Sequence, residues 1–302
     1  MSKAGEKLTG IIIKRYSGFY YVWDGQHEWE CSLRGKFRLT KQSFVPGDRV
    51  KISIVDSAKY KAVIEGLEER QNELIRPTVS NVEQAIIVMA VANPEPDFWL
   101  LDRMLVMIQA NEIKPVICFN KVDLLNAEKS EDSLLQYSDY QDISFPFLMT
   151  SSKTGQGLDQ LREILANKIS VLAGPSGVGK SSLLNKLEGL TLKTGDVGAK
   201  TERGKHTTRH VELIKLSGGG LLADTPGFSN VYLPKDMKKE ELSQYYPEYL
   251  SYRKECRFNT CLHWEEPGCA VRDAVEEGML SKGRYQRYLT LLEEIITAER
   301  RF

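Results

Sequence analysis

The stretch GPSGVGKSS, residues 174–182, decides the fold of the middle of this chain. It fits the pattern G-x-x-x-x-G-K-S, in which backbone N–H groups point at phosphates and glycines let the chain approach them closely. The apolar run ISVLA precedes the stretch, and the helix-compatible SSLLNKLEGL follows it. A loop rich in Gly and Ser can match by chance, but the flanking strand and helix favour a true phosphate-binding loop.

Two side chains of this loop carry chemistry. Lys180 supplies a cation to the β- and γ-phosphates, and the Ser181 hydroxyl ligates magnesium. We expect the whole loop to contact the nucleotide: Gly174, Pro175, Ser176, Gly177, Val178, Gly179, Lys180, Ser181 and Ser182.

The motif DTPG follows the apolar run GLLA further along the chain. Its position at a strand end lets Asp224 hold magnesium through water, and the Gly227 N–H can sense a γ-phosphate. Alone, the motif would be a common turn. After a phosphate loop and a second strand candidate, HVELIKL, it indicates a nucleotide site.

A polar segment without hydrophobic period, TERGKHTTRH (201–210), separates the two motifs. This is the expected place of a first switch loop, whose Thr completes the coordination of magnesium when the γ-phosphate is present. We assign that role to Thr208, with Thr207 as the near alternative.

The stretch CFNKVDLL (118–125) contains N-K-x-D, the pattern by which GTPases read guanine. The Asp123 carboxylate can accept hydrogen bonds from both the N1–H and the 2-amino group of guanine. Adenine has no N1 proton and would leave that acceptor unpaired, at a cost on the order of 1–3 kcal/mol or more. We therefore expect GTP selectivity from four residues: Asn120, Lys121, Val122 and Asp123.

The segment TSSKTG (150–155) ends the next apolar strand, where a companion base-contact loop belongs. We read Ser151, Ser152 and Lys153 as that loop. Along the chain, the five predicted nucleotide-binding elements are therefore the base-reading motif NKVD, the companion loop, the phosphate loop, the switch Thr and the DxxG motif, in that order. This is a cyclic rotation of the ordinary order, and loops at strand ends converge in space whatever their order along the chain.

The first 70 residues predict short strands rich in Val, Ile and aromatic residues, separated by Gly, Pro and Asp. Several such strands in so few residues favour a small barrel, and an OB-fold is the leading candidate. The alternative is a generic barrel used for protein contact. The basic residues Arg34, Lys36 and Arg38 form a binding loop or an ordinary solvated loop.

The polar segment 68–84 has the composition of a domain boundary. After it, continuous apolar runs at 85–91, 114–120, 144–150 and 168–174 alternate with helical stretches. Buried strands that alternate with helices predict a parallel sheet covered on both faces.

From about residue 233 the chain is polar and tyrosine-rich, and it ends in a predicted helix with the apolar stripe Tyr285, Tyr288, Leu289, Leu292 and Ile296. Before that helix lie Cys256, Cys261, His263 and Cys269. Three thiolates and one imidazole form a tetrahedral set suited to zinc. Because all four ligands are protein side chains, we expect one structural zinc per chain. The alternative is buried cysteines beside a surface histidine.

The remaining cysteines, Cys31 and Cys118, stand alone in apolar runs and predict buried free thiols. Acidic and basic residues balance at 41 each, so only their distribution could create a docking surface. No apolar run reaches the length of about 18 residues typical of a membrane span, and the first ten residues lack the apolar core of a secretory signal. We expect a cytoplasmic monomer without membrane contact.

These features together resemble the RsgA family, also called YjeQ or YloQ, of ribosome small subunit-dependent GTPases. The resemblance rests on the permuted order, the N-terminal barrel, GPSGVGKSS, GKHTTRH, DTPGF and the C-x4-C-x-H-x5-C cluster. It implies an OB domain, a circularly permuted GTPase domain and a mainly helical zinc-binding domain, which we place at 1–70, 71–232 and 233–302. The switch segment has Lys before the His where the family more often has Arg, and Arg where it has a third Thr.

The family resemblance also implies a role in late maturation of the small ribosomal subunit. We expect the GTP form to bind the subunit and its rRNA, the subunit to stimulate hydrolysis to GDP, and the protein then to leave. Many GTPases orient the attacking water with a Gln directly after DxxG, but Phe228 stands there. His206 is the nearest candidate by sequence, and its alternative role is to hold the loop or contact rRNA.

Two other functions fit parts of the sequence. One is a non-enzymatic binding module in which GTP occupancy acts as a sensor, and turnover with and without ribosomal subunits would distinguish it. The other is an ATP-dependent RNA-remodelling enzyme, against which the NKVD motif argues.

Overall fold

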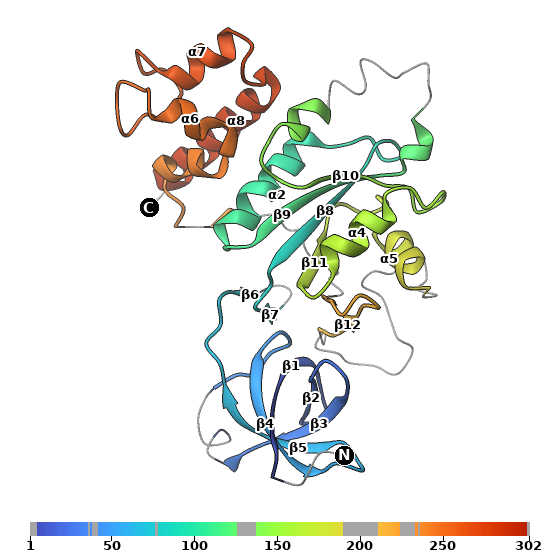
Figure 1. The fold of residues 1–302 in the computed structure, drawn as a ribbon. Helices are drawn as coiled ribbons and strands as arrows, with labels where there is room; N and C mark the ends of the chain where they lie inside the picture. The colour runs from blue at the N-terminus through green and yellow to red at the C-terminus, as the bar shows by residue number, and fades with distance from the viewer. Residues whose placement is uncertain are drawn as a thin grey trace.

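The computed structural model describes residues 5–35, 37, 42–75, 78–125, 137–189, 211–223, 233–234 and 236–300, and the structural statements below concern these residues. Figure 1 shows a barrel at the N-terminal end, a central sheet flanked by helices, and a helical C-terminal region beside the helix Phe98–Ala110 of the sheet layer. No described helix combines the length and the apolar character needed to cross a bilayer.

The N-terminal strands close into a five-stranded barrel in the order β1-β2-β3-β5-β4. Their bounds are β1 Lys7–Tyr16, β2 Phe19–Trp23, β3 Glu28–Leu33, β4 Arg49–Asp56 and β5 Lys61–Leu67. All neighbouring pairs are antiparallel except β3 and β5, which run parallel. A closed five-stranded barrel of this connectivity confirms the predicted OB-fold. Cys31 lies fully buried in its core, and burial raises the pKa of this free thiol to about 12.

The segment predicted as a plain boundary contains a small hairpin, β6 (Glu73–Ile75) and β7 (Thr78–Ser80). It is fastened to the barrel by Asp48, which is fully buried and accepts hydrogen bonds of 2.7 Å from both Arg70 Nε and Ser80 Oγ. A buried carboxylate with charged and neutral donors is well compensated. The barrel is therefore joined to the rest of the chain by a structured connection.

The central sheet has the order β10-β9-β8-β11-β13-β12. Its strands are β8 Gln84–Ala90, β9 Lys114–Asn120, β10 Phe147–Met149, β11 Ile169–Ala173, β12 Leu213–Lys215 and β13 Leu221–Ala223. The four strands predicted from continuous apolar runs, β8 to β11, pair in parallel as predicted. The sheet also contains an antiparallel pair that was not predicted, β12 with β13. The five residues between them suffice for a hairpin, whereas a parallel pair needs a crossover of a dozen or more residues.

Helices cover both faces of this sheet (Figure 1). Alternate residues of β8 point to opposite faces: Ile87 and Met89 join the apolar cluster under α2 (Phe98–Ala110), and Ile86 and Val88 join the cluster under the other two helices. Those are α4 (Leu158–Leu165) and α5 (Lys180–Glu188). The period of two along a strand that is buried throughout explains its continuous apolar sequence.

The C-terminal region is helical, as predicted. Its elements are the 3-10 turns η3 Lys239–Tyr245 and η4 Pro247–Tyr249 and the helices α6 Leu250–Arg253, α7 Ala270–Glu276 and α8 Lys282–Glu299. The buried face of α8 is wider than the predicted stripe. It adds Leu291, Ile295 and a buried Arg284, while Leu289 and Ile296 are only partly buried. The predicted stripe contained only apolar and tyrosine residues, so it did not include Arg284, which is buried against carboxylates.

Candidate functional site

The phosphate-binding loop connects β11 to the first residue of α5 and requires glycine at three places. Gly174, Gly177 and Gly179 all have positive φ angles, of 128°, 82° and 96°. A Cβ on Gly174 would lie 2.1 Å from the carbonyl oxygen of Val88 in the neighbouring strand. The loop therefore passes as close to the sheet as a chain without side chains allows, and it opens into the N-terminus of α5, where free N–H groups favour anions.

Lys180 is folded back over its own loop. Its Nζ donates hydrogen bonds of 2.7 Å to the carbonyl oxygens of Gly174 and Pro175. Burial lowers the pKa of this ammonium group. A phosphate chain lying in the loop would supply the negative charge that the partly buried cation lacks, so the lysine is placed to bind it. Ser181, the predicted magnesium ligand, is buried beside it at the start of the helix.

Asn120 connects the base-reading strand to the phosphate loop. Its Nδ2 donates to the carbonyl oxygen of Val178 at 2.9 Å, while its Oδ1 accepts from Thr150 Oγ1 at 3.3 Å and from Ser152 N at 3.4 Å. The side chain is fully buried, so these bonds are not exchanged with water. One carboxamide thus joins three loops that are separated along the chain.

Asp123 is oriented by the companion loop. Ser151 Oγ donates to Asp123 Oδ1 at 2.6 Å, and Thr154 N donates to Ser151 Oγ at 3.1 Å, so the serine proton points at the carboxylate. Lys153 Nζ lies 3.8 Å from the other carboxylate oxygen. The hydroxyl of Ser151 and the ammonium group of Lys153 orient the carboxylate, and its remaining lone pairs stay available to accept hydrogen bonds from guanine.

Lys121 occupies the left-handed region with φ 66°, and its Nζ donates to the carbonyl oxygen of Asn93. Asn93 lies in the loop after β8, and a Cβ added to Gly177 of the phosphate loop would lie 3.7 Å from the side chain of the next residue, Pro94. This loop and Thr150 were not among the site residues predicted from the sequence. The signal available was their position at the carboxyl ends of β8 and β10, on the same edge as the assigned residues.

The structure brings together the predicted base-reading, companion and phosphate-loop residues at the carboxyl ends of β9, β10 and β11. Apart from Ser181, the predicted switch and magnesium residues lie outside the described residues, as do two of the basic residues of the barrel loop: His206, Thr207, Thr208, Asp224, Gly227, Phe228, Lys36 and Arg38.

The four predicted metal ligands also converge, in the loop between α6 and α7. The ligand atoms of Cys256, Cys261, His263 and Cys269 all lie within 4.8 Å of one another. His263 Nδ1 is 3.6 Å from Cys256 Sγ and 3.4 Å from Cys269 Sγ. Tetrahedral zinc with bonds of about 2.0–2.3 Å keeps its ligand atoms roughly 3.5–3.8 Å apart, so the set fits a metal ion of this type.

The surroundings of this cluster suit metal binding. Burial, with a smaller contribution from the charge of Arg253, lowers the pKa of His263 to about 4, which keeps the imidazole neutral. Burial raises the pKa of Cys261 to about 12, so a metal ion has to displace a proton from its thiol. Helix α8 holds the ligand loop, because Tyr285 and Tyr288 donate to the carbonyl oxygens of His263 and Leu262 at 2.8 and 2.7 Å.

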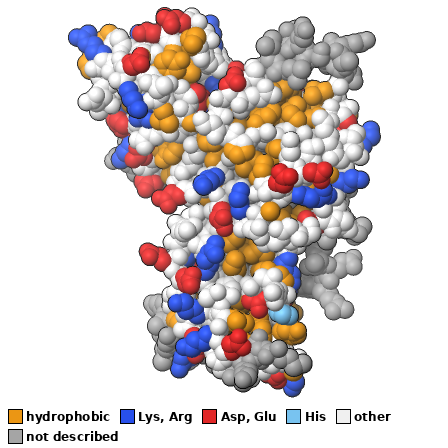
Figure 2. All heavy atoms as spheres, viewed as in Figure 1, with side chains coloured by type: hydrophobic (Ala, Val, Ile, Leu, Met, Phe, Trp, Pro, Cys, Tyr) orange, Lys and Arg blue, Asp and Glu red, His pale blue; other side chains and the backbone are white. Residues whose placement is uncertain are grey.

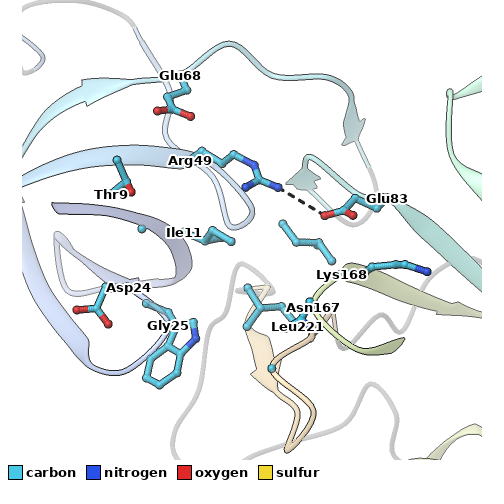
Figure 3. A pocket seen from close by; sticks show the side chains of 14 residues that line it. Thr9, Ile11, Asp24, Gly25, Arg49, Glu68, Glu83, Asn167, Lys168 and Leu221 are labelled. Atoms are coloured by element: carbon cyan, nitrogen blue, oxygen red, sulfur yellow. Dashed lines mark hydrogen bonds and ion pairs between the residues drawn. The ribbon is translucent and has the colours of Figure 1, made fainter. Parts of the chain in front are cut away.

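A separate cavity of about 300 Å³ lies between the barrel and the opposite, amino-terminal edge of the central sheet. Figure 3 shows Arg49 of the barrel reaching Glu83 of the sheet across it, with 3.5 Å between the charged groups. Trp23, Lys168 and Leu221 also line it. The cavity is not part of the nucleotide site, because the predicted nucleotide-binding loops lie at the carboxyl ends of the strands.

Comparison with known families agrees with this geometry. A family model described as RsgA GTPase matches residues 67–234, and one described as RsgA N-terminal domain matches residues 9–63. A small ribosomal subunit biogenesis GTPase RsgA from Moorella thermoacetica is 49% identical over 296 residues, which cover 98% of this chain and 100% of the relative. A protein of the same name from Carboxydothermus hydrogenoformans is 48% identical over 295 residues, 97% and 99% of the two chains.

Two solved structures are similar over nearly the whole chain. YjeQ from Thermotoga maritima superposes with a TM-score of 0.82 at 36% identity, covering 96% of this chain and 99% of that one. YloQ, described as a circularly permuted GTPase, gives a TM-score of 0.83 at 39% identity, with 98% of both chains covered. The family resemblance inferred from the motifs is confirmed.

Proposed function

Because the chain belongs to the RsgA GTPase family, we propose that its GTPase activity serves late maturation of the small ribosomal subunit. The observation that carries this is the bond from Asn120 to Val178, which unites the guanine-reading and phosphate-binding loops in spite of their permuted order. The similarity to relatives named for small subunit biogenesis, at up to 49% identity over the whole chain, supports the choice of partner.

The GTP form binds the small subunit and its rRNA, and the GDP form leaves. In hydrolysis, a water oxygen bonds the γ-phosphorus while the bond from that phosphorus to the β–γ bridging oxygen breaks, giving GDP and phosphate. Lys180 stabilises the charge that develops on the transferred group, and Asp123 selects guanine. Magnesium neutralises phosphate charge when it is bound, and Ser181, Thr208 and Asp224 are the residues that would hold it.

The attacking water needs an orienting group that Phe228 cannot supply. We assign this role to His206, which the switch segment carries. The Gly227 N–H contacts the γ-phosphate in this scheme. The isolated protein then turns over slowly, and the subunit accelerates it by ordering the switch segment.

The metal of the Cys256, Cys261, His263 and Cys269 cluster is zinc in this proposal, one ion per chain. Four protein ligands leave no open position for substrate, so the ion stabilises the C-terminal region. The chain divides into a barrel at 1–70, a GTPase domain at 71–232 and a zinc-binding domain at 233–302. We place the protein in the cytoplasm and expect it to act as a monomer on the ribosomal subunit.

The test is the rate of GTP hydrolysis with and without purified small ribosomal subunits, together with co-sedimentation of the protein with subunits. We expect acceleration on the order of a hundredfold and co-sedimentation only with a GTP analogue. Lys180→Ala is the control, since it keeps the fold and removes hydrolysis. Equal rates with and without subunits would contradict the role in subunit maturation and leave a GTP-occupied binding module as the better description.

A further inference from the structure

The hairpin of β12 and β13 lies between the barrel and the nucleotide motifs. Along the chain, β12 starts three residues after the switch segment 201–210, and β13 ends at Ala223, directly before Asp224. In space, β12 contacts β1 of the barrel, and Figure 1 shows it at the side of the sheet nearest the barrel. One short hairpin therefore links the barrel to both phosphate-sensing segments.

Four side chains of alternating charge cross this contact. Lys215 Nζ of the hairpin lies 2.9 Å from Glu28 Oε2 of β3, and the other Glu28 oxygen lies 3.1 Å from Lys14 Nζ of β1. Lys14 Nζ in turn lies 3.3 Å from Glu212 Oε1, the residue before β12. The chain of charges thus leaves the hairpin at Glu212 and returns to it at Lys215.

These groups shift one another's pKa values. Burial alone would raise the pKa of Glu28, but the hydrogen bonds and charges of Lys215 and Lys14 together hold it below its ordinary value. Lys215 also lies 4.5 Å from the centre of the Trp23 ring of β2, a cation–π distance. Acidic and basic side chains are interspersed over the waist between the barrel and the sheet in Figure 2.

Apolar contact adds to the ion pairs. Ile13 of β1 is buried in the same cluster as Leu213 of β12 and Leu221 of β13. Next to this contact, between the barrel and the amino-terminal edge of the sheet, lies the 300 Å³ cavity. Arg49 and Glu83 bridge it, with 3.5 Å between their charged groups. The barrel is thus attached firmly to the hairpin and more loosely to the sheet edge, and polar interfaces between domains of this kind permit relative motion.

We propose that the β12–β13 hairpin couples the barrel to the nucleotide site, so that a partner bound to the barrel controls hydrolysis through Glu28 and Lys215. This rests on the proposed function, because it names how the small subunit stimulates the GTPase. A shift of the barrel moves the hairpin, and along the chain the hairpin follows the end of the predicted switch segment 201–210 and precedes the DTPG motif that begins at Asp224. Coupling requires two arrangements of one element that both sites bias.

The experiment exchanges the charges of the central pair. Glu28→Lys and Lys215→Glu each place like charges together, and the double variant restores an opposite pair. Each single variant should lower the subunit-stimulated rate about fivefold, the lower end of the usual range for coupled sites. Unstimulated rate, GTP affinity and subunit co-sedimentation should stay unchanged, and the double variant should recover most of the stimulated rate.

The matched control is Glu30→Lys with Lys61→Glu. This pair, at 3.4 Å, joins β3, the strand that also carries Glu28, to β5 within the barrel and does not reach the hairpin. This control should keep full stimulation. Stimulated rates equal to wild type in both single variants would overturn the coupling. Loss of subunit binding in Glu28→Lys would also overturn it, since the residue would then be a docking contact.

A second measurement needs no ribosomal subunit. Hydrogen exchange of β1, β3, β12 and β13 should differ between the GDP and GTP-analogue forms of the wild type, and the single variants should lose the difference in β1 and β3 only. Equal exchange of the barrel strands in both nucleotide forms would overturn the proposal. If subunits fail to stimulate even the wild type, the proposed function fails, while the exchange comparison still decides the coupling.

Discussion

Asn120 shows how a single side chain can fix the spacing between the predicted base-reading and phosphate-binding loops. Its amide hydrogen goes to the phosphate loop, and its oxygen receives hydrogen bonds from the companion loop. Because the carboxamide is buried, a change in any of the three loops would leave an unpaired donor or acceptor in the interior. The permuted chain order does not weaken this arrangement, since the contacts depend on neighbouring strands rather than on neighbouring sequence.

Gly179→Ala tests this role of Asn120. A Cβ at position 179 would lie 2.4 Å from Asn120 Nδ2, and the backbone has a φ of 96°, so the amide must leave its place against Val178. An unsatisfied buried donor costs about 1–3 kcal/mol, and we expect GTP affinity to fall roughly 5- to 150-fold in a fluorescent-nucleotide titration.

Gly189→Ala is the control for that variant. Gly189 ends the same helix in the same left-handed region, with φ 64°, and a Cβ there meets nothing within 4 Å. It carries the backbone strain without the collision. Equal affinities for the two variants would show that Asn120 does not set the geometry of the site.

Asp123→Asn tests base selection. The new amide has only one acceptor oxygen, so it cannot accept from the guanine N1–H and 2-amino groups at once, but its NH2 can donate to the C2 oxygen of xanthine. We expect weaker GTP binding and a preference for xanthosine triphosphate in a competition titration, because mismatched hydrogen bonds in a built site discriminate strongly. Unchanged GTP affinity would remove NKVD from the site. Ser151→Ala, which removes the 2.6 Å hydrogen bond to the carboxylate, should weaken GTP binding without changing the preferred base.

At this scale the sequence predicted the base-reading, companion and phosphate-loop residues that the structure gathers at the carboxyl ends of β9, β10 and β11, since few residue types can do that chemistry. It did not predict Asn93, because the group used there is a backbone carbonyl, which every residue possesses. Thr150 was missed for a related reason. Its hydroxyl acts on Asn120 rather than on the nucleotide, and only the pairing of β9 with β10 brings the two together.

The metal-binding loop shows an element whose stability depends on protonation. In the folded metal-free protein the pKa of His263 is about 4, against an ordinary value of 6.5. Between these two values the unfolded chain binds a proton that the folded chain does not. Stability is therefore complete above about pH 6.5 and falls as the pH drops towards 4, by at most about 1.4 kcal/mol per pH unit for one proton.

Urea unfolding of chelator-treated protein between pH 4 and 7 measures this dependence. Carboxylates titrate in the same range, so the decisive quantity is the difference between wild type and His263→Gln, which lacks the imidazole. The wild type should lose more stability than the variant on acidification. Parallel curves would contradict the burial of a neutral His263.

Elements were predicted well where hydrophobic period and length agreed, as in β8 and α2. The features that were not predicted depend on contacts between different segments of the chain. The antiparallel course of β12 follows from the short turn after Lys215, and the hairpin of β6 and β7 is held by the buried carboxylate of Asp48, which a local reading of a polar segment cannot show.

The three parts of the molecule are joined by polar contacts of two kinds. The barrel meets the edge of the sheet across the cavity through the solvent-accessible Arg49–Glu83 ion pair, which salt screens. The C-terminal region meets α2 through a buried network in which Asp102 accepts hydrogen bonds from Arg284, Arg287 and, at 2.9 Å, Tyr140. Burial alone would lower the pKa of Arg284, but the carboxylates of Asp102 and Glu248 hold it well above its ordinary value. The first contact suits motion, and the second fixes the C-terminal region.

Asp102→Asn tests that distinction. The substitution keeps the shape of the side chain but leaves two largely buried guanidinium groups without their shared charge. Removing one partner of a buried ion pair costs about 3–5 kcal/mol, so we expect a loss of this size in urea unfolding and faster proteolytic release of the C-terminal region. Asp159→Asn, at an exposed ion pair with Arg162, should change stability by less than about 0.5 kcal/mol. A comparable small effect of Asp102→Asn would mean that apolar packing of Val106 and its neighbours, rather than the charge network, holds the region in place.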